Sequence, residues 1–199
     1  MAAARPLKFT IMRFCLTTLI FLGALVLQAQ AGIDFSATTG DRELEGMHFP
    51  QLIFHQNEHE ITYEKPRDWT FGSDSSGMRL APPNVSQAQV TVGQIPLTTP
   101  QVFDDPATKQ LQQFVLSSAP PDAQNVALIS EEKNPLQIHG QPTYAVTIGY
   151  NYFSQDFESC VLFANLGDTQ VRFRTTARKA DFDKVHRAFR GSLFSLSWK

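Results

Sequence analysis

The sequence predicts an α+β fold in which an antiparallel twisted sheet has two main helices packed on it. Short segments of alternating apolar and polar residues recur along the chain, which is the pattern of half-buried strands. Two well-separated stretches instead have apolar residues at helical spacing. Three consecutive strands near the C-terminal end are joined by short turns, as in an antiparallel meander. Runs of strands around separated helices favour α+β over an alternating α/β arrangement.

The first 31 residues have the features of a secretory signal peptide. Arg5, Lys8 and Arg13 precede an apolar run from Cys15 to Leu27, and Ala29-Gln30-Ala31 supplies a small-residue cleavage site. The apolar run is shorter than the roughly 20 residues that a membrane-spanning helix needs. We therefore expect a secreted or periplasmic protein that keeps no stable membrane span after cleavage.

The charge balance gives no electrostatic reason to expect nucleic acid as a partner. The whole chain has 17 basic and 19 acidic residues, and a formal net charge of −2. Loss of residues 1–31 would leave 14 basic against 19 acidic side chains, a net charge of −5. Nucleic-acid-binding surfaces depend on an excess of Lys and Arg. Translation from Met12 rather than Met1 would leave this mature part unchanged.

The folded domain is predicted to span residues 51–199. Residues 32–50 are polar and aperiodic, so we expect a mobile N-terminal segment there. Alternation and turn residues then predict strands at 51–54, 61–65, 69–71, 78–80, 87–95, 126–133, 144–150, 157–163 and 171–176. The strand at 126–133 is expected to end at Asn134-Pro135, because proline cannot donate to a sheet ladder.

Two helices are predicted from caps and apolar stripes. Asp105 can cap the first helix, and Pro106 suits its first turn because the missing N–H costs nothing there. Asp181 can cap the second helix, which is expected to end at Gly191. The stripe of the first helix consists of Ala107, Leu111, Phe114 and Val115, and that of the second of Phe182, Val185 and Phe189.

The stretch from Ile61 to Phe71 joins a strand, a proline corner and a second strand. Ile61 and Tyr63 share one face of the first strand, and Pro66 interrupts that strand. Trp69 and Phe71 share a face of the second strand, and we expect their rings to be buried. The spacing of Tyr63, Pro66 and Trp69 resembles the opening signature of PsbP/Mog-like domains.

A second segment supports the same resemblance. Gly140-Gln-Pro-Thr-Tyr144 is similar to the family's turn before a long strand, although Thr143 stands where the family often has a small residue. The resemblance covers about residues 50–199 and suggests an uncharacterised bacterial secreted member. It implies an α/β/α sandwich and brings no catalytic residue. The better-known members are PsbP of photosystem II and the Ran-binding protein Mog, which act as assembly or interaction partners; those partners do not transfer to an exported chain.

The best candidate for a metal site is His55-Gln-Asn-Glu-His59. Two imidazoles four residues apart suit zinc on a helix, and Glu58, Glu60 or His48 could supply a third ligand. This stretch, however, is predicted as strand and turn, where the same residues form a solvated turn. The solvated turn is the interpretation we favour.

The C-terminal region is locally basic. Its cations are Arg172, Arg174, Arg178, Lys179, Lys184 and Arg187. Arg172 and Arg174 point the same way from one predicted strand, which would suit an anion or an acidic partner. We favour the alternative, a solvated surface partly neutralised by Asp181 and Asp183, because charge runs usually mark exposed faces.

Single residues suggest little further chemistry. Cys160 is the one cysteine left after cleavage, so no intrachain disulfide can form, and it is expected to be a buried small hydrophobe. His186 is expected to be a satisfied packing residue and His139 a turn residue. Asn84-Val-Ser86 fits a glycosylation acceptor in a host that glycosylates exported proteins.

The sequence thus predicts an exported, non-catalytic binding or accessory domain that acts through protein–protein contact. It contains no phosphate-binding loop, dinucleotide fingerprint, paired-cysteine motif or serine elbow. We assign no catalytic, cofactor-binding or metal residue and expect no cofactor and no nucleic-acid partner. Two alternatives remain open: a metal-dependent enzyme that uses the His/Glu cluster, and a small-ligand or lipid-binding module built on the 16 phenylalanines.

Overall fold

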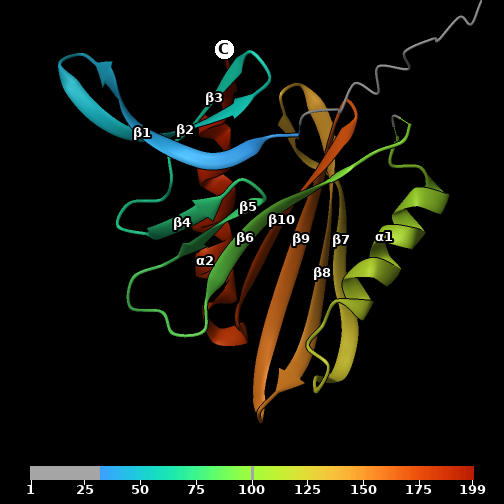
Figure 1. Cartoon of the computed structure of the whole chain (residues 1–199). Helices are drawn as coiled ribbons and strands as arrows, with labels where there is room; N and C mark the ends of the chain where they lie inside the picture. The colour runs from blue at the N-terminus through green and yellow to red at the C-terminus, as the bar shows by residue number, and fades with distance from the viewer. Residues whose placement is uncertain (1–31, 100) are drawn as a thin grey trace, which may run out of the picture.

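The computed structural model describes residues 32–99 and 101–199; the predicted signal peptide, residues 1–31, lies outside them. A seven-stranded antiparallel sheet forms the middle of the protein (Figure 1). In spatial order its strands are β4 (Thr70–Asp74), β5 (Gly77–Ala81), β6 (Gln89–Pro96), β10 (Thr169–Arg178), β9 (Gln155–Leu166), β8 (Gln141–Tyr152) and β7 (Gln124–Ile138). Strands β8, β9 and β10 pair consecutively, which confirms the predicted meander.

A second, four-stranded sheet was not predicted. Its strands in spatial order are β1 (Asp34–Leu44), β2 (Met47–Gln56), β3 (His59–Tyr63) and the C-terminal β11 (Ser197–Trp198). β11 pairs antiparallel with β3, so the end of the chain closes one edge of this sheet. The long β1–β2 hairpin projects from the body of the protein (Figure 1).

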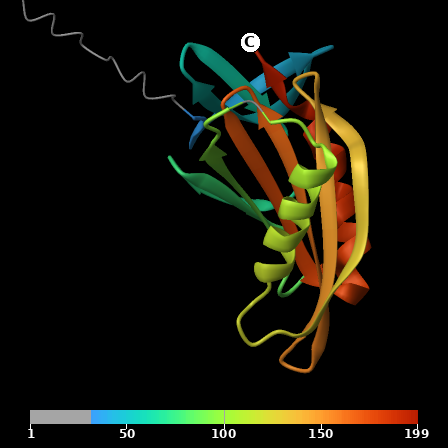
Figure 2. The same ribbon diagram turned by 90° about the vertical axis from the view of Figure 1, so that its right-hand side faces the viewer.

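The two helices lie on opposite faces of the large sheet (Figure 2). They are α1 (Asp105–Ser117) and α2 (Lys179–Ser192), and a short 3₁₀ turn, η1 (Leu193–Ser195), follows α2. α2 buries Phe182, Val185 and Phe189, as its predicted stripe required. No helix of the described ranges is long and apolar enough to cross a membrane.

The expected α/β/α sandwich is wrong, because the fold is a sheet-rich α+β fold with two sheets. One continuous apolar cluster contains Phe54 from the small sheet, Leu162 from the large sheet and Phe189 from α2. The second sheet and α2 therefore form one layer together on the large sheet, whereas in an α/β/α sandwich that layer would consist of helices alone. A smaller cluster lies between α1 and the other face of the large sheet.

Residues 32–50, expected to be mobile, instead supply β1 and the start of β2. Ile33 and Phe35 are buried, and the Phe35 ring contacts Phe54 edge-on with centroids 5.8 Å apart. The side-chain amide of Gln94 accepts from the Ile33 N–H at 2.8 Å and donates to its C=O at 2.6 Å. Apolar alternation fails to reveal β1 because most of its later residues are exposed.

Three predicted boundaries are also corrected. The N-cap of α1 is Asp104, which accepts from the Ala107 N–H at 2.9 Å, and Asp105 is the first helical residue. α2 begins at Lys179 without a side-chain cap, two residues before Asp181. β7 continues through Asn134-Pro135 with a register shift, because a bulge on an edge strand can absorb a proline.

Tyr63 and Trp69 at the proline corner are buried as predicted, whereas Phe71 is half-buried. Tyr63 is fully enclosed, and its hydroxyl lies 2.7 Å from the Ser192 Oγ at the end of α2. Burial raises the pKa of Tyr63 well above its usual value, which keeps the hydroxyl protonated. Trp69 is buried in the same cluster. Both residues are part of the apolar core. The signature formed by Tyr63, Pro66 and Trp69 therefore has a structural role in this protein.

Candidate functional site: the uncovered face of the large sheet

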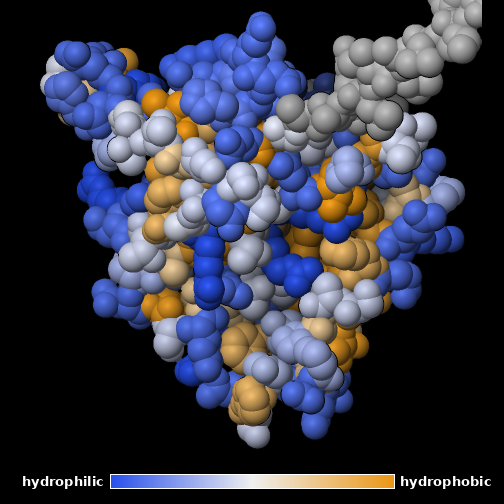
Figure 3. Space-filling model, in the orientation of Figure 1, coloured by the Kyte–Doolittle hydropathy of each residue, from blue (hydrophilic) through white to orange (hydrophobic). Residues whose placement is uncertain are grey.

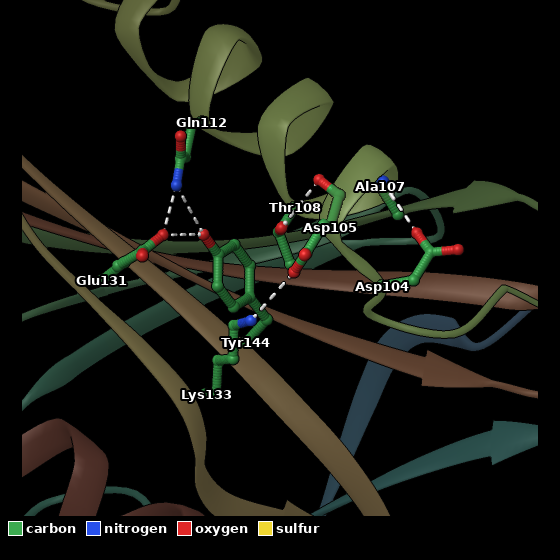
Figure 4. A network of polar contacts seen from close by, with 8 residues as sticks. All are labelled: Asp104, Asp105, Ala107, Thr108, Gln112, Glu131, Lys133 and Tyr144. Carbon is green, nitrogen blue, oxygen red and sulfur yellow. Dashed lines mark hydrogen bonds and ion pairs between the residues drawn. The ribbon is translucent and has the colours of Figure 1, made fainter.

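A polar network fixes α1 over one part of the large sheet (Figure 4). The Tyr144 hydroxyl on β8 donates to the Glu131 carboxylate on β7 at 2.6 Å. The Gln112 amide on α1 donates to the same carboxylate and, at 3.1 Å, to the Tyr144 oxygen. Lys133 on β7 pairs with Asp105 in the first turn of α1 at 3.2 Å. These contacts hold α1 at the β7–β8 side of the sheet.

The protonation states of this network suit a structural role. Burial raises the pKa of Tyr144 to about 12, and the hydrogen bond to Glu131 adds to the effect. Hydrogen bonds from Tyr144 and then Gln112 lower the pKa of Glu131. At neutral pH the tyrosine therefore stays a donor and the carboxylate an acceptor, so the contact persists across the physiological range.

Because α1 sits to one side, the same face of β4, β5 and β6 is left uncovered, and α1 reaches only part of β10 (Figure 1). Directly paired residues of neighbouring strands point to the same side. The ladder places Arg79 opposite Thr91 and Thr91 opposite Arg174, so these three side chains form one row. Arg172 and Arg178 follow the same alternation along β10. We call the surface defined by Arg79, Arg172, Arg174 and Arg178 the arginine face.

The arginine face is hollow at its β4–β5 end. A Cβ atom added at Gly72 or Gly93 would meet no other atom within 4 Å. An open concavity of about 640 Å³ is lined chiefly by β4 and β5 and includes Arg79. Figure 3 views this side of the protein, where strongly hydrophilic side chains gather between two hydrophobic areas.

Neighbouring groups hold the arginines on β10 in place. The Arg172 guanidinium lies 4.2 Å from the centroid of the Phe114 ring on α1, and its Nε donates to Gln170 at 2.9 Å. Arg174 donates to the Ser118 C=O at 3.2 Å and to the Ser118 Oγ at 2.6 Å. The C-terminal end of a helix carries partial negative charge, so this position favours a cation.

The positive charge of the arginine face is not balanced by carboxylates. Within residues 32–99 and 101–199, none of the four arginines takes part in an ion pair. The pKa of Arg172 is lowered by burial and then by the charge of Arg174, although an arginine remains protonated. Asp74 lies at the rim, but its carboxylate already accepts from Ser76 and the Gly77 N–H in its own turn.

The structure separates the predicted basic cluster into two parts. Arg172 and Arg174 share one side of β10 as expected, and Arg178 joins them. Lys179, Lys184 and Arg187 belong instead to α2, on the opposite side of the sheet. Asp181 and Asp183, expected to neutralise the cluster, also lie on α2. The favoured interpretation of a neutralised surface therefore does not fit Arg172 and Arg174.

Arg79 was not identified from the sequence. The buried residues Met78 and Leu80 on either side indicate that Arg79 points away from the core. Its neighbours on the surface, however, come from β6 and from β10, which follows Arg79 by about 90 residues. Strand pairing alone brings it to Arg174, and single-sequence patterns do not specify that pairing.

The structure does not bring His55 and His59 together. In the β2–β3 hairpin His55 pairs with Glu60 and His59 with Gln56. Successive pairs point to opposite faces, so the two imidazoles diverge. The His59 Nδ1 instead lies 3.3 Å from the Lys199 C=O. The part of the chain that is described contains no group of three or more His, Cys, Asp or Glu residues arranged to hold a metal.

Other single-residue expectations are settled by burial. Cys160 is a buried free cysteine, as predicted, and burial raises the pKa of its thiol to about 11. It therefore carries almost no thiolate at neutral pH. Asn84 lies exposed in a turn between β5 and β6. An apolar cavity beneath α2 has a volume of about 10 Å³, far smaller than a ligand pocket of roughly 300 Å³ or more.

His186 packs as predicted but is not fully satisfied. Its ring stacks on Phe182 with centroids 5.3 Å apart, while the buried Nδ1 has no hydrogen-bond partner among the described residues. Burial, and then the charge of Arg190, lower the pKa of His186; Glu132 and Asp183 oppose the shift. The folded state thus holds this imidazole neutral at pH values where the unfolded chain is protonated.

We expect His186 to make the protein less stable below neutral pH. Its folded-state pKa lies below the unfolded value of about 6.5, so stability is retained above that pH and lost as pH falls through the folded-state pKa. Urea unfolding at pH 7.5 and 5.5 should show a smaller loss for His186→Phe than for the wild type. The exposed His48→Phe variant should keep the wild-type loss, and equal losses in all three proteins would contradict the expectation.

Comparison with known proteins identifies the fold. No family model and no curated relative matches the sequence. The solution structure of cyanobacterial PsbP from Synechocystis sp. PCC 6803 matches with a TM-score of 0.51 and 14% identity, over 79% of this chain and 97% of that one. The chain therefore has a PsbP-like fold, which confirms the resemblance at the level of the fold.

Two further solved structures are similar to a lesser degree. LpqN of Mycobacterium tuberculosis, described as involved in cell envelope biogenesis, matches with a TM-score of 0.48 and 12% identity, over 83% of this chain and 93% of that one. A Pseudomonas aeruginosa protein of unknown function, described as a putative regulator, matches with a TM-score of 0.39 and 10% identity, over 78% and 93%. With TM-scores below 0.5, these two add nothing to the assignment.

Proposed function

We propose that the chain is an exported accessory domain that works by binding another protein, without catalysis of its own. The observation that carries the proposal is the arginine face, where β4, β5 and β6 are left uncovered beside β10 and four arginines lack carboxylate partners among the described residues. Like charges held close together without counter-charges are unfavourable, and an acidic partner would relieve that repulsion.

Two features of the sequence support the same proposal. The basic, apolar and small-residue order of residues 1–31 is typical of a cleaved export signal, which supports a location of the mature chain outside the cytoplasm. The resemblance to PsbP/Mog-like domains implies a contact role, since the better-known members are assembly or interaction proteins. A fold alone does not set a function, so the argument depends on the surface.

Site-specific photocrosslinking in the cells that make the protein tests the contact role. A photoreactive benzoylphenylalanine would replace Thr91, in the middle of the arginine face, or Lys184, exposed on α2 on the opposite side. We expect a discrete protein adduct from position 91 and none from position 184. Absence of an adduct at 91, or equal adducts at both positions, would contradict the proposal.

Export is tested separately by cell fractionation. The full chain should be recovered outside the cytoplasm in a form shortened by about 31 residues, whereas a chain lacking residues 1–31 should stay inside the cell. A full chain that remains cytoplasmic and unprocessed would remove export from the proposal and leave the contact role to be judged by the crosslinks.

A further inference from the structure

We propose that the arginine face binds an extended acidic segment of the partner, with carboxylates on alternate residues. This inference rests on the proposed contact function and specifies the chemistry of the partner. It follows from the spacing of the arginines, from the hydrogen-bond donors they leave free and from the shape of the surface.

The spacing of the arginines matches an extended peptide. Arg172 and Arg174 are two residues apart on β10, which puts their Cα atoms about 7 Å apart. An extended peptide presents every second side chain on one face at the same spacing. When the peptide lies along the strand, one glutamate can therefore meet Arg172 while the glutamate two residues away lies beside the charge of Arg174.

Arg79 provides charge on the other side of the same surface. The row Arg79–Thr91–Arg174 spans two strand spacings, so the two arginine backbones are about 10 Å apart. Gly93, on β6 between these two strands, leaves the surface open there, because a Cβ added at it would contact nothing within 4 Å. A single peptide strand can lie in this space with cations along both of its sides.

The donors needed for carboxylate binding are free on Arg172 and Arg79, whereas both terminal nitrogens of Arg174 donate to Ser118. Arg172 uses only its Nε, on Gln170, so its two terminal nitrogens remain available for a bidentate pair. Its position over the Phe114 ring restricts the side chain before binding, which reduces the entropy lost when a ligand is held. In the described part of the chain, Arg79 has no hydrogen-bond or ion-pair partner and is exposed.

The geometry favours a peptide over a compact anion or a membrane. The arginines are distributed across to β5 and along β10, where Arg172 and Arg178 are six residues or about 20 Å apart, so a single phosphate cannot meet all four. α1 stands on the same side of the large sheet as the arginines (Figure 2). A flat lipid surface would meet this helix before it reached the arginines on β10.

Fluorescence anisotropy with defined probes tests the inference. The purified protein would be titrated into a labelled eight-residue peptide that alternates glutamate and threonine, and into the same peptide with lysine in place of glutamate. We expect binding of the glutamate peptide only, weakened by added salt. Arg79→Gln combined with Arg172→Gln should weaken binding about tenfold, while Arg187→Gln plus Lys184→Gln on α2, with the same loss of charge, should not.

Each other outcome overturns the inference. Equal binding by the wild type and the Arg79/Arg172 variant, with both shown to be folded by circular dichroism, would place the acidic site elsewhere. Binding of inorganic phosphate or of phosphatidylglycerol vesicles in place of the peptide would assign the surface to a compact anion or a membrane. If the peptide fails to bind while a photoreactive residue at position 91 still crosslinks to a protein, the inference of an acidic segment is wrong and the contact function stands. If the peptide fails to bind and no crosslink forms at position 91, both proposals are wrong.

Discussion

Replacement of Phe189 by alanine is expected to lower the free energy of unfolding by about 3–5 kcal/mol. Phe189 lies on the inner side of α2, is 2% exposed, and has its ring centroid 6.2 Å from that of Phe173 on β10. It belongs to the apolar cluster that joins α2 to both sheets. Removal of the ring leaves a cavity that the surrounding side chains cannot fill without moving two layers of the fold.

Phe194 provides a matched control for this substitution. It lies five residues further along the chain in η1, but its side chain is 75% exposed. Phe194→Ala should change the free energy of unfolding by no more than about 0.5 kcal/mol. Urea unfolding followed by tryptophan fluorescence measures both variants, with Trp69 and Trp198 as reporters. Equal losses for the two variants would show that α2 does not pack as described.

Phe35→Ala is expected to lower the free energy of unfolding by about 3 kcal/mol or more. Phe35 is 3% exposed and packs edge-on against Phe54 of the neighbouring strand. A mobile N-terminal segment would instead tolerate the change without loss. The substitution therefore distinguishes the strand β1 seen in the structure from the mobile segment that the sequence suggests.

Leu44 in the same strand serves as the control for Phe35. It lies near the tip of the β1–β2 hairpin and is 49% exposed, so Leu44→Ala should leave the free energy of unfolding within about 0.5 kcal/mol of the wild type. Limited proteolysis adds a local measurement, since loss of Phe35 should make residues near the N-terminal end of β1 easier to cleave. A stable Phe35→Ala variant with unchanged cleavage would contradict the packing of β1.

The sequence identifies elements whose pattern is strong within a few residues. The apolar stripe of α2, the placement of the large β8 side chains on one face and the burial of Trp69 each follow from neighbouring residues, and the structure confirms all three. The small sheet was missed for the same reason. β1 has only Phe35 as a buried apolar residue within its bounds, which is too little alternation to predict a strand.

The candidate site is only half visible in the sequence. Arg172 and Arg174 alternate on one strand, so their common direction is a local property. Whether they meet a helix, a counter-charge or open space depends on which part of the face α1 covers. That position is set by contacts between α1, β7 and β8, such as Gln112 with Tyr144, which no local pattern encodes.

The sequence by itself determined that this chain begins with the features of an export signal and contains two amphipathic helices, a meander and a buried aromatic corner. Each of these depends on side chains close together along the chain, where periodicity reflects burial directly. Only the tertiary structure decided that residues 34–44 form a strand and that Arg79 lies in one row with Arg174. Strand pairing joins residues far apart in sequence through backbone hydrogen bonds, which are common to all residue types and leave little trace in composition.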